Sequence, residues 1–184
     1  MTEKKKRLVK FIGKCLYAQV YPGQERAAHP EAIKKDPHIA EDKHYQITVE
    51  CSKSLYEKLL YAGISRMTIL KEFEGDTYLT IKGSKQRKDK NTNQMYIFPD
   101  PIVLDIDDLP MAPDILIGNG SYVEVIAELA DVNHFKALRL HKVKVLNLIP
   151  YVRSEIEGEI EFEEEQKEGD RKEHNKNKEE KNLF

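Results

Sequence analysis

SYVEVIAELA at residues 121–130 and ALRLHKVKVLNLI at residues 137–149 are the two stretches that decide the fold. The first alternates apolar and polar residues with a period of two, which is typical of a β-strand with one buried face. In the second, the apolar positions change phase between Leu140 and Val143, which predicts a β-bulge near His141 and Lys142. We expect the two strands to pair as a hairpin.

Shorter strands are predicted earlier in the chain by the same alternation. The strongest of them is residues 45–51, where Tyr45, Ile47, Val49 and Cys51 would face the core. A polar, lysine-rich segment at residues 83–93 separates two further candidates, which indicates a hairpin with a basic tip. The other predicted strands are residues 16–21, 77–82 and 94–98.

A long loop and a single helix are predicted between these strands. Residues 24–43 contain two prolines and scattered charges, without sustained periodicity, which favours a long surface loop. Ser54 and Glu57 form a capping-box signature and predict a helix of about two turns that ends at Gly63.

These elements predict an all-β fold, with two parts of different charge. A small OB-fold-like β-barrel with one short helix is favoured over a sandwich for residues 1–154. Residues 155–184 carry 12 acidic and 6 basic side chains, so the chain's net charge of -2 divides into -6 there and +4 on the rest. We expect this segment to be a flexible, disordered acidic tail, because from Gln166 onward it is almost free of apolar residues until Leu183 and Phe184.

Cysteine content and hydropathy limit the cellular context. Cys15 and Cys51 are the only cysteines, and the charged N-terminal residues do not resemble a signal peptide. The apolar runs are far shorter than the roughly 20 residues needed to cross a bilayer. The sequence therefore predicts a cytoplasmic protein without a membrane span.

Cations and aromatic residues concentrate around the predicted basic hairpin. Proteins that bind single-stranded nucleic acid use cations to follow the phosphates and aromatic rings on which bases stack. The register that would decide whether Tyr96 and Phe98 stack on bases or fill the core is left open. A second set, Arg139 and Lys142, would be turned to one face by the bulge. The candidate binding residues at the hairpin are Tyr78, Lys82, Lys85, Arg87, Lys88, Lys90, Tyr96 and Phe98.

Other chemistries have weaker signals. His29, His38 and His44 lack the spacing of a zinc site, so no metal is expected there. The sequence also shows no Ser/His/Asp order, no glycine-rich phosphate loop and no Cys-x-x-Cys, so no cofactor or catalytic residue is expected. Two alternatives stay open. Asp105, Asp107 and Asp108 could hold a magnesium ion in a nuclease, although they also fit an ordinary turn. The barrel could also be an adaptor that binds another protein, with the basic hairpin as a surface loop.

Several blocks in a fixed order resemble a known family. They are HYQITV at residues 44–49, the lysine-rich hairpin between Tyr78 and Tyr96, IGNGS at residues 117–121, the closing strand at residues 138–151, and the terminal Phe184. The sequence resembles the single-stranded DNA-binding proteins of short-tailed bacteriophages. It departs from them in a tail that mixes lysines with the acids and in a shorter helix region.

This resemblance implies an OB-fold that coats and protects single-stranded DNA during phage replication and recombination. It also implies an acidic tail that contacts phage replication proteins, namely the polymerase and the helicase-primase, in the cytoplasm of a bacterial host. We expect Leu183 and Phe184, an apolar pair on a polar tether, to be the contact with such a partner. A homodimer is also compatible with the sequence.

Overall fold

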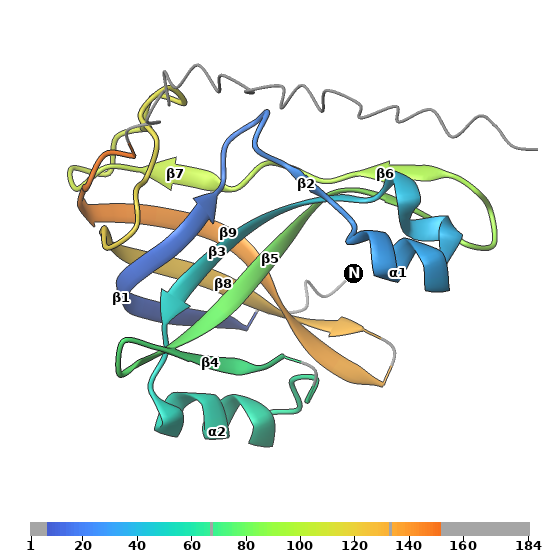
Figure 1. The fold of residues 1–184 in the computed structure, drawn as a ribbon, viewed down its shortest axis with the longest axis horizontal. Helices are drawn as coiled ribbons and strands as arrows, with labels where there is room; N and C mark the ends of the chain where they lie inside the picture. Colours follow the sequence, from blue (N-terminus) through green and yellow to red (C-terminus); the bar gives the residue numbers. More distant parts are fainter. Residues whose placement is uncertain (1–6, 67, 133, 152–184) are drawn as a thin grey trace, which may run out of the picture. The chain divides into compact units, whose positions relative to one another are not determined.

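Five long strands form a closed barrel in the computed structural model, which describes residues 7–66, 68–132 and 134–151 (Figure 1). Strand β3 (Lys43–Glu50) pairs antiparallel with β1 (Leu8–Gln19) and with β5 (Asp76–Lys88). Strands β8 (Tyr122–Val132) and β9 (Phe135–Asn147) form a hairpin, and β8 also pairs with β1. The barrel closes where β9 runs parallel to β5, at Lys82 and Arg139. This connectivity is that of an OB-fold, as the sequence predicts.

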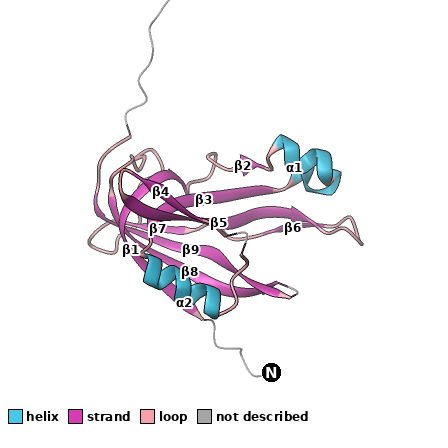
Figure 2. Ribbon diagram, turned by 60° about the horizontal axis from the view of Figure 1, so that its bottom comes forward, coloured by secondary structure: helices cyan, strands magenta, loops and turns pink. Residues whose placement is uncertain are grey.

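Short helices and strands lie at the two ends of the barrel. Helix α2 (Lys53–Tyr61) and strand β4 (Leu70–Phe73) lie at one end of β5, and helix α1 (Pro30–Lys35), the 3-10 helix η1 (Pro37–Glu41) and strand β6 (Met95–Ile97) lie at the other (Figures 1 and 2). Strand β2 (Arg26–Ala27) pairs with β3, and strand β7 (Ile102–Leu104) runs parallel to β9.

The core consists of the alternate residues that the sequence pattern points inward. Tyr45, Ile47 and Val49 of β3 are fully buried, as are Val123 and Val125 of β8. Ile126 of β8 pairs with Lys142 of β9, and the next residue, Ala127, pairs with Leu140, so His141 is the extra residue of a bulge in β9. The predicted bulge is therefore confirmed, and it explains how apolar residues on both sides of it face the core.

Close approach of backbones explains two glycines. A Cβ on Gly83 would lie 3.2 Å from atoms of Leu140, where β5 and β9 meet to close the barrel. A Cβ on Gly118 would lie 2.6 Å from the Ile149 carbonyl oxygen, which is too close for any residue with a side chain. Ser121 then joins these segments, because its Oγ donates to the Gly118 carbonyl and accepts from the Ile149 N–H. The IGNGS block thus has a structural role: it holds the loop before β8 against the segment that follows β9.

Three local predictions were wrong or incomplete. Strand β1 begins at Leu8 and not at residue 16. The helix cap is Ser52, whose Oγ accepts from the Leu55 N–H, and not Ser54. The segment expected to be a plain loop holds β2, α1 and η1, so the fold has more than one short helix. Among the described residues, no helix is long and apolar enough to cross a membrane.

Candidate nucleic-acid interface

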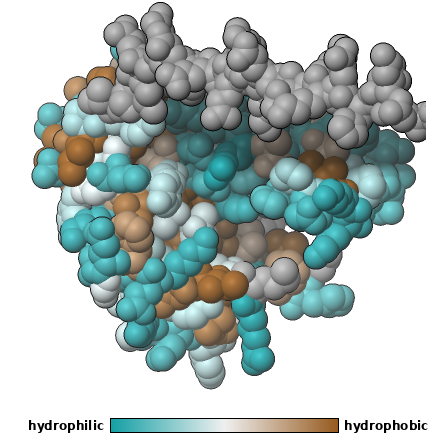
Figure 3. All heavy atoms as spheres, viewed as in Figure 1, coloured by the Kyte–Doolittle hydropathy of each residue, from teal (hydrophilic) through white to brown (hydrophobic). Residues whose placement is uncertain are grey.

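A groove of about 930 Å³ runs along β5 between the α1–η1 segment and β6. We call it the basic groove. Its cations come from β3, β5 and the β5–β6 turn, and its rings from the β6 side. Three histidines and three aspartates, Asp36, Asp42 and Asp89, also line it. In Figure 3 this end of the molecule is mostly hydrophilic, with few apolar side chains among the polar ones. The residues that carry this character are Lys43, Lys82, Arg87, Lys88, Lys90, His29, His38, His44, Tyr96 and Phe98.

The β5–β6 hairpin places its cations differently from the sequence prediction. Strand β5 continues to Lys88, so Lys85, Arg87 and Lys88 lie on a strand, and only Lys90 lies in the turn. The turn is closed by Asp89, whose Oδ1 accepts from the backbone N–H groups at 91 and 92. Arg87 lies directly opposite Tyr96 in the ladder, so a cation and an aromatic ring share one face.

The cations differ in whether an acid neutralises them. Lys88 Nζ lies 2.7 Å from Glu41 Oε1, Lys90 pairs with Asp36, and Lys85 Nζ lies 2.5 Å from Asp100 Oδ1. Within the described part of the chain, Lys82 and Arg87 make no ion pair. Lys43 of β3 makes none either, so on the β5 side of the groove Lys82 and Arg87 are the cations that can meet a phosphate without first releasing a carboxylate.

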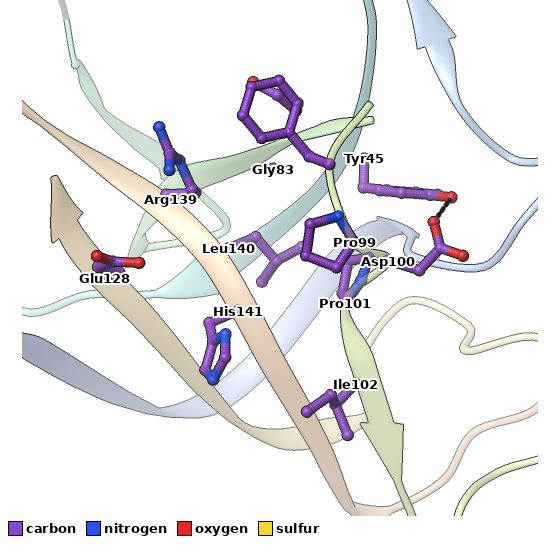
Figure 4. Close-up of a pocket in the computed structure, with 12 residues that line it drawn as sticks. Tyr45, Gly83, Pro99, Asp100, Pro101, Ile102, Glu128, Arg139, Leu140 and His141 are labelled. Carbon is purple, nitrogen blue, oxygen red and sulfur yellow. Dashed lines mark hydrogen bonds between the residues drawn. The ribbon is translucent and has the colours of Figure 1, made fainter. Parts of the chain in front are cut away.

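Lys85 belongs to a network that anchors the end of the barrel. The Tyr45 hydroxyl donates to Asp100 Oδ1 at 2.7 Å, a bond drawn in Figure 4, and the same carboxylate accepts from Lys85. The hydrogen bond from Lys85, followed by that from Tyr45, lowers the pKa of Asp100. Burial, reinforced by the two carboxylates that its hydroxyl contacts, raises the pKa of Tyr45. Lys85 is thus engaged in holding Asp100 rather than free in the groove.

A smaller apolar pocket of about 320 Å³ adjoins the basic groove and shares Ser84 and Phe98 with it. Pro99, Pro101 and Leu140 contribute to its lining, and Arg139 lies at its edge (Figure 4). The Arg139 guanidinium carbon is 5.6 Å from the centre of the Phe98 ring, within range of a cation–π contact. Residues far apart in sequence therefore form one cation and ring pair beside the groove.

The structure answers the question about the hairpin aromatics. Tyr96 is 46% exposed and Phe98 is half-buried, and both line the groove, so neither fills the barrel core. Tyr78 is different: it is only 4% exposed, and the Phe73 ring of the neighbouring strand β4 packs edge-on against it. We therefore leave Tyr78 out of the candidate interface.

Lys142, predicted together with Arg139, is displaced from the groove. It lies beyond the bulge, opposite Ile102 of β7 and Ile126 of β8, and does not line the groove or the apolar pocket. The bulge does keep both cations outside the barrel core. The two side chains lie on different parts of the surface, and of the two only Arg139 lies beside the Phe98 ring.

Sequence reasoning missed the contribution of β3. Lys43 and His44 line the groove because His44 is opposite Ser84, and Gln46 opposite Lys82, in the β3–β5 ladder. Burial, and then the positive charges of Lys82 and Arg26, lower the pKa of His44. The signal was present as polar residues alternating with the buried ones of β3, but only the register shows which groove they face.

The aspartates of the nuclease alternative have structural partners. Asp105 Oδ1 accepts from the N–H groups of residues 107 and 109, which is an ordinary turn, and Asp108 pairs with Lys144 at 2.7 Å. Among the described residues, no three His, Cys, Asp or Glu side chains are placed to hold a metal ion. Leu183, Phe184 and the rest of the predicted tail lie outside the described residues.

No protein-family model and no curated protein matches this chain. Solved structures do. The crystal structure of gp2.5, a single-stranded DNA-binding protein encoded by bacteriophage T7, is 14% identical over 82% of this chain and 91% of its own, with a TM-score of 0.49. The single-stranded DNA-binding protein from bacteriophage Enc34 is 12% identical over 81% and 86%, with a TM-score of 0.44.

The Enc34 protein in complex with single-stranded DNA also matches, at 14% identity over 79% of this chain and 89% of its own, with a TM-score of 0.45. The chain is therefore similar to solved proteins of the class that its sequence blocks resemble. At these identities and TM-scores, the basis for assigning a function to this chain is its own surface.

Proposed function

We propose that the basic groove binds single-stranded DNA without sequence preference and without chemical turnover. The observation that supports this is the presence of Lys82 and Arg87, free of ion pairs within the described residues, beside the accessible rings of Tyr96 and Phe98. OB-folds bind oligonucleotides on the face of their second and third strands, which here are β3 and β5. The groove lies on that face.

Accessible rings favour a single strand over a duplex. A base in a duplex has its faces covered by neighbouring bases, whereas an unpaired base can stack on Phe98 or Tyr96. Stacking tolerates every base, because each has a π-face, and it contributes about 1–3 kcal/mol per base. Phosphate contacts are equally independent of sequence. The combination favours a protein that coats single strands of any sequence.

Titration of a fluorescent oligo-dT and of a duplex of equal length at several salt concentrations tests this proposal. We expect the single strand to bind more tightly, and its log affinity to fall with log salt by about 0.7 per phosphate contact. Affinity that does not depend on salt, or equal affinity for the duplex, would contradict the proposal. Incubation of the labelled strand with magnesium tests the nuclease alternative, which predicts cleavage.

A role in phage DNA replication and recombination is the finer part of the proposal. The sequence resemblance and the tail composition support it: a net charge of -6 and a terminal apolar pair suit a segment that recruits replication proteins. We propose Leu183 and Phe184 as the contact with the partner. Loss of binding to a replication polymerase or helicase-primase on deletion of these two residues, with DNA affinity kept, is the expected result. Unchanged partner binding would contradict it.

A further inference from the structure

A second pocket, of about 390 Å³, lies where the end of β1 meets the loop before β8. We call it the Tyr17 pocket. Two tyrosine rings stand at it, Tyr17 at 59% and Tyr151 at 56% exposed. The amides of Gln19 and Asn119 and the guanidinium of Arg26 supply its polar groups. None of these residues belongs to the predicted binding set, and none lines the basic groove.

Gln19 carries an unusual buried atom. Its Oε1 is inaccessible to solvent, yet it accepts no hydrogen bond. A buried acceptor without a partner costs about 1–3 kcal/mol, so folded proteins rarely keep one without a reason. The Gln19 Nε2 also makes no hydrogen bond within the described residues. The Gln19 amide is therefore unpaired at the wall of the pocket, and rotation of its side chain would turn the amide edge toward a ligand.

Tyr17 is held in an uncommon backbone conformation. Its φ is +50°, a region that large side chains rarely occupy. The strain coincides with an irregularity in the β1–β3 register between Leu16 and Gln19, and the Tyr17 N–H donates to Asn119 Oδ1 at 2.8 Å. Such strain persists where surrounding structure enforces it, and it often accompanies binding sites. Here its effect is to leave the ring exposed at the pocket.

Arg26 connects this pocket to the basic groove. It lies on β2 directly opposite His44 of β3, and its charge contributes to lowering the pKa of His44. His44 itself lines the basic groove together with Lys82. Positive groups thus lead from the groove across β3 to the Tyr17 pocket. A phosphate chain bound in the groove can follow them.

We propose that the Tyr17 pocket holds one base of the bound strand, with the base stacked on Tyr17, its edge paired with the Gln19 amide, and its phosphate beside Arg26. This inference rests on the proposed function and extends the binding path beyond the basic groove. Every nucleobase presents an N–H donor next to an acceptor on its pairing edge. An amide matches such a pair in either orientation, so the subsite accepts any base.

The experiment uses a set of oligo-dT strands of the shortest length that gives full affinity, each with one abasic position. In the wild-type protein, removal of the base that occupies the pocket should weaken binding by about tenfold, the effect of one lost stack. With Tyr17→Asn, the uniform strand should lose about the same factor and that position should become insensitive to base removal. With Gln19→Leu, the uniform strand should lose a smaller factor and base removal should still weaken binding, because the stack on Tyr17 remains. Asn is chosen because it tolerates a positive φ better than other side chains that lack a ring.

Two controls separate binding from folding. Tyr17→Phe keeps the ring and should bind like the wild type. Gln19→Leu removes a buried acceptor without a partner, so its melting temperature should stay the same or rise while its affinity falls. The salt slope of both binding-deficient variants should match the wild type, because no phosphate contact has been removed.

The failures are distinguishable. If the wild type binds oligo-dT with a salt dependence but Tyr17→Asn and Gln19→Leu bind as tightly as it does, the pocket is not a base subsite and the groove proposal stands. If the wild type does not bind single strands at all, the proposed function itself fails. A Gln19→Leu variant that loses affinity together with melting temperature would assign Gln19 a structural role and overturn its pairing with a base.

Discussion

The two walls of the basic groove carry opposite charge. The β5 wall and its turn present Lys82, Arg87, Lys88 and Lys90, whereas the facing α1–η1 segment, residues 29–42, presents Asp36, Glu41 and Asp42. The acids neutralise Lys88 and Lys90 but do not reach Lys82 or Arg87. A count of lysines and arginines therefore overstates the charge that a DNA strand meets. The unpaired cations, and not the number of cations, should set affinity.

The largest expected effect comes from removing Lys82 and Arg87, the two cations of the β5 wall that make no ion pair within the described residues. Lys82→Ala with Arg87→Ala should weaken binding to oligo-dT by about 3 kcal/mol, a little over a hundredfold, if each forms one charge-assisted hydrogen bond to a phosphate. The salt slope should fall by about 1.4, which is 0.7 for each of two contacts. Fluorescence anisotropy titrations at several salt concentrations measure both quantities.

The matched control is the double variant Lys88→Ala with Lys90→Ala, in which Lys82 and Arg87 are kept. It removes the same number of charges from the same wall, but from side chains already paired with Glu41 and Asp36. We expect a clearly smaller loss. Equal losses in the two double variants would mean that ion pairing within the groove does not decide which cations bind, and the comparison of the walls would fail.

Phe98 should come next. Phe98→Ala removes a half-buried ring that borders both the groove and the apolar pocket and that lies under Arg139. The expected loss is about 2 kcal/mol, within the range for one stacked base, with the salt slope nearly unchanged. Phe98→Tyr is the control, because it keeps a stacking face. A lower salt slope in Phe98→Ala that Phe98→Tyr does not show would instead point to a role of the ring in holding Arg139 near a phosphate.

Neutralising the acidic wall should act in the opposite direction. Asp36→Asn with Glu41→Gln frees Lys90 and Lys88, so affinity should rise a few-fold and the salt slope should become steeper. The lowered pKa of Asp36, caused first by its hydrogen bond from Lys90, shows that the pair favours the charged carboxylate. Weaker binding by this variant would instead show that the ion pairs shape the groove for DNA.

The barrel was predictable from sequence because its strands keep a strict period. The β8–β9 hairpin shows this best: a single break in alternation, between Leu140 and Val143, was enough to locate the bulge at His141. The α1–η1 wall was not predictable in the same way. Six-residue and five-residue helices are too short to show a period, and Pro30 and Pro37, which suggested a loop, are the first residues of these helices.

The sequence predicted which types of residue form the candidate site, but not which other residues pack against them or pair with them. Cations and rings near the β5–β6 hairpin were found from composition along a strand. Their availability depends on which residues fold against them: Phe73 covers Tyr78, and Asp36 and Glu41 neutralise Lys90 and Lys88. The Tyr17 pocket left even less of a signal, because its members come from four separate segments of the chain.

The smallest expected effect concerns His44, on the floor between the two walls. Burial is the main cause of its lowered pKa, so the imidazole is neutral near pH 7. A phosphate beside Lys82 would favour the imidazolium, so binding should take up protons and affinity should rise modestly as pH falls from 7 towards 5.5. Calorimetric titrations in buffers of different ionisation enthalpy measure this uptake, with His44→Gln as the variant that cannot titrate.

The free protein should respond to the same pH change in the opposite sense. The unfolded chain binds a proton at its ordinary histidine pKa, whereas the folded chain resists it, so the contribution of His44 to stability is present above that pKa and is lost as pH falls below it. His44→Gln should lessen both trends, because it removes the group that titrates. The contrary outcome is an affinity that falls together with stability between pH 7 and 5.5, to the same extent in the wild type and in His44→Gln. It would place the bound phosphates away from His44.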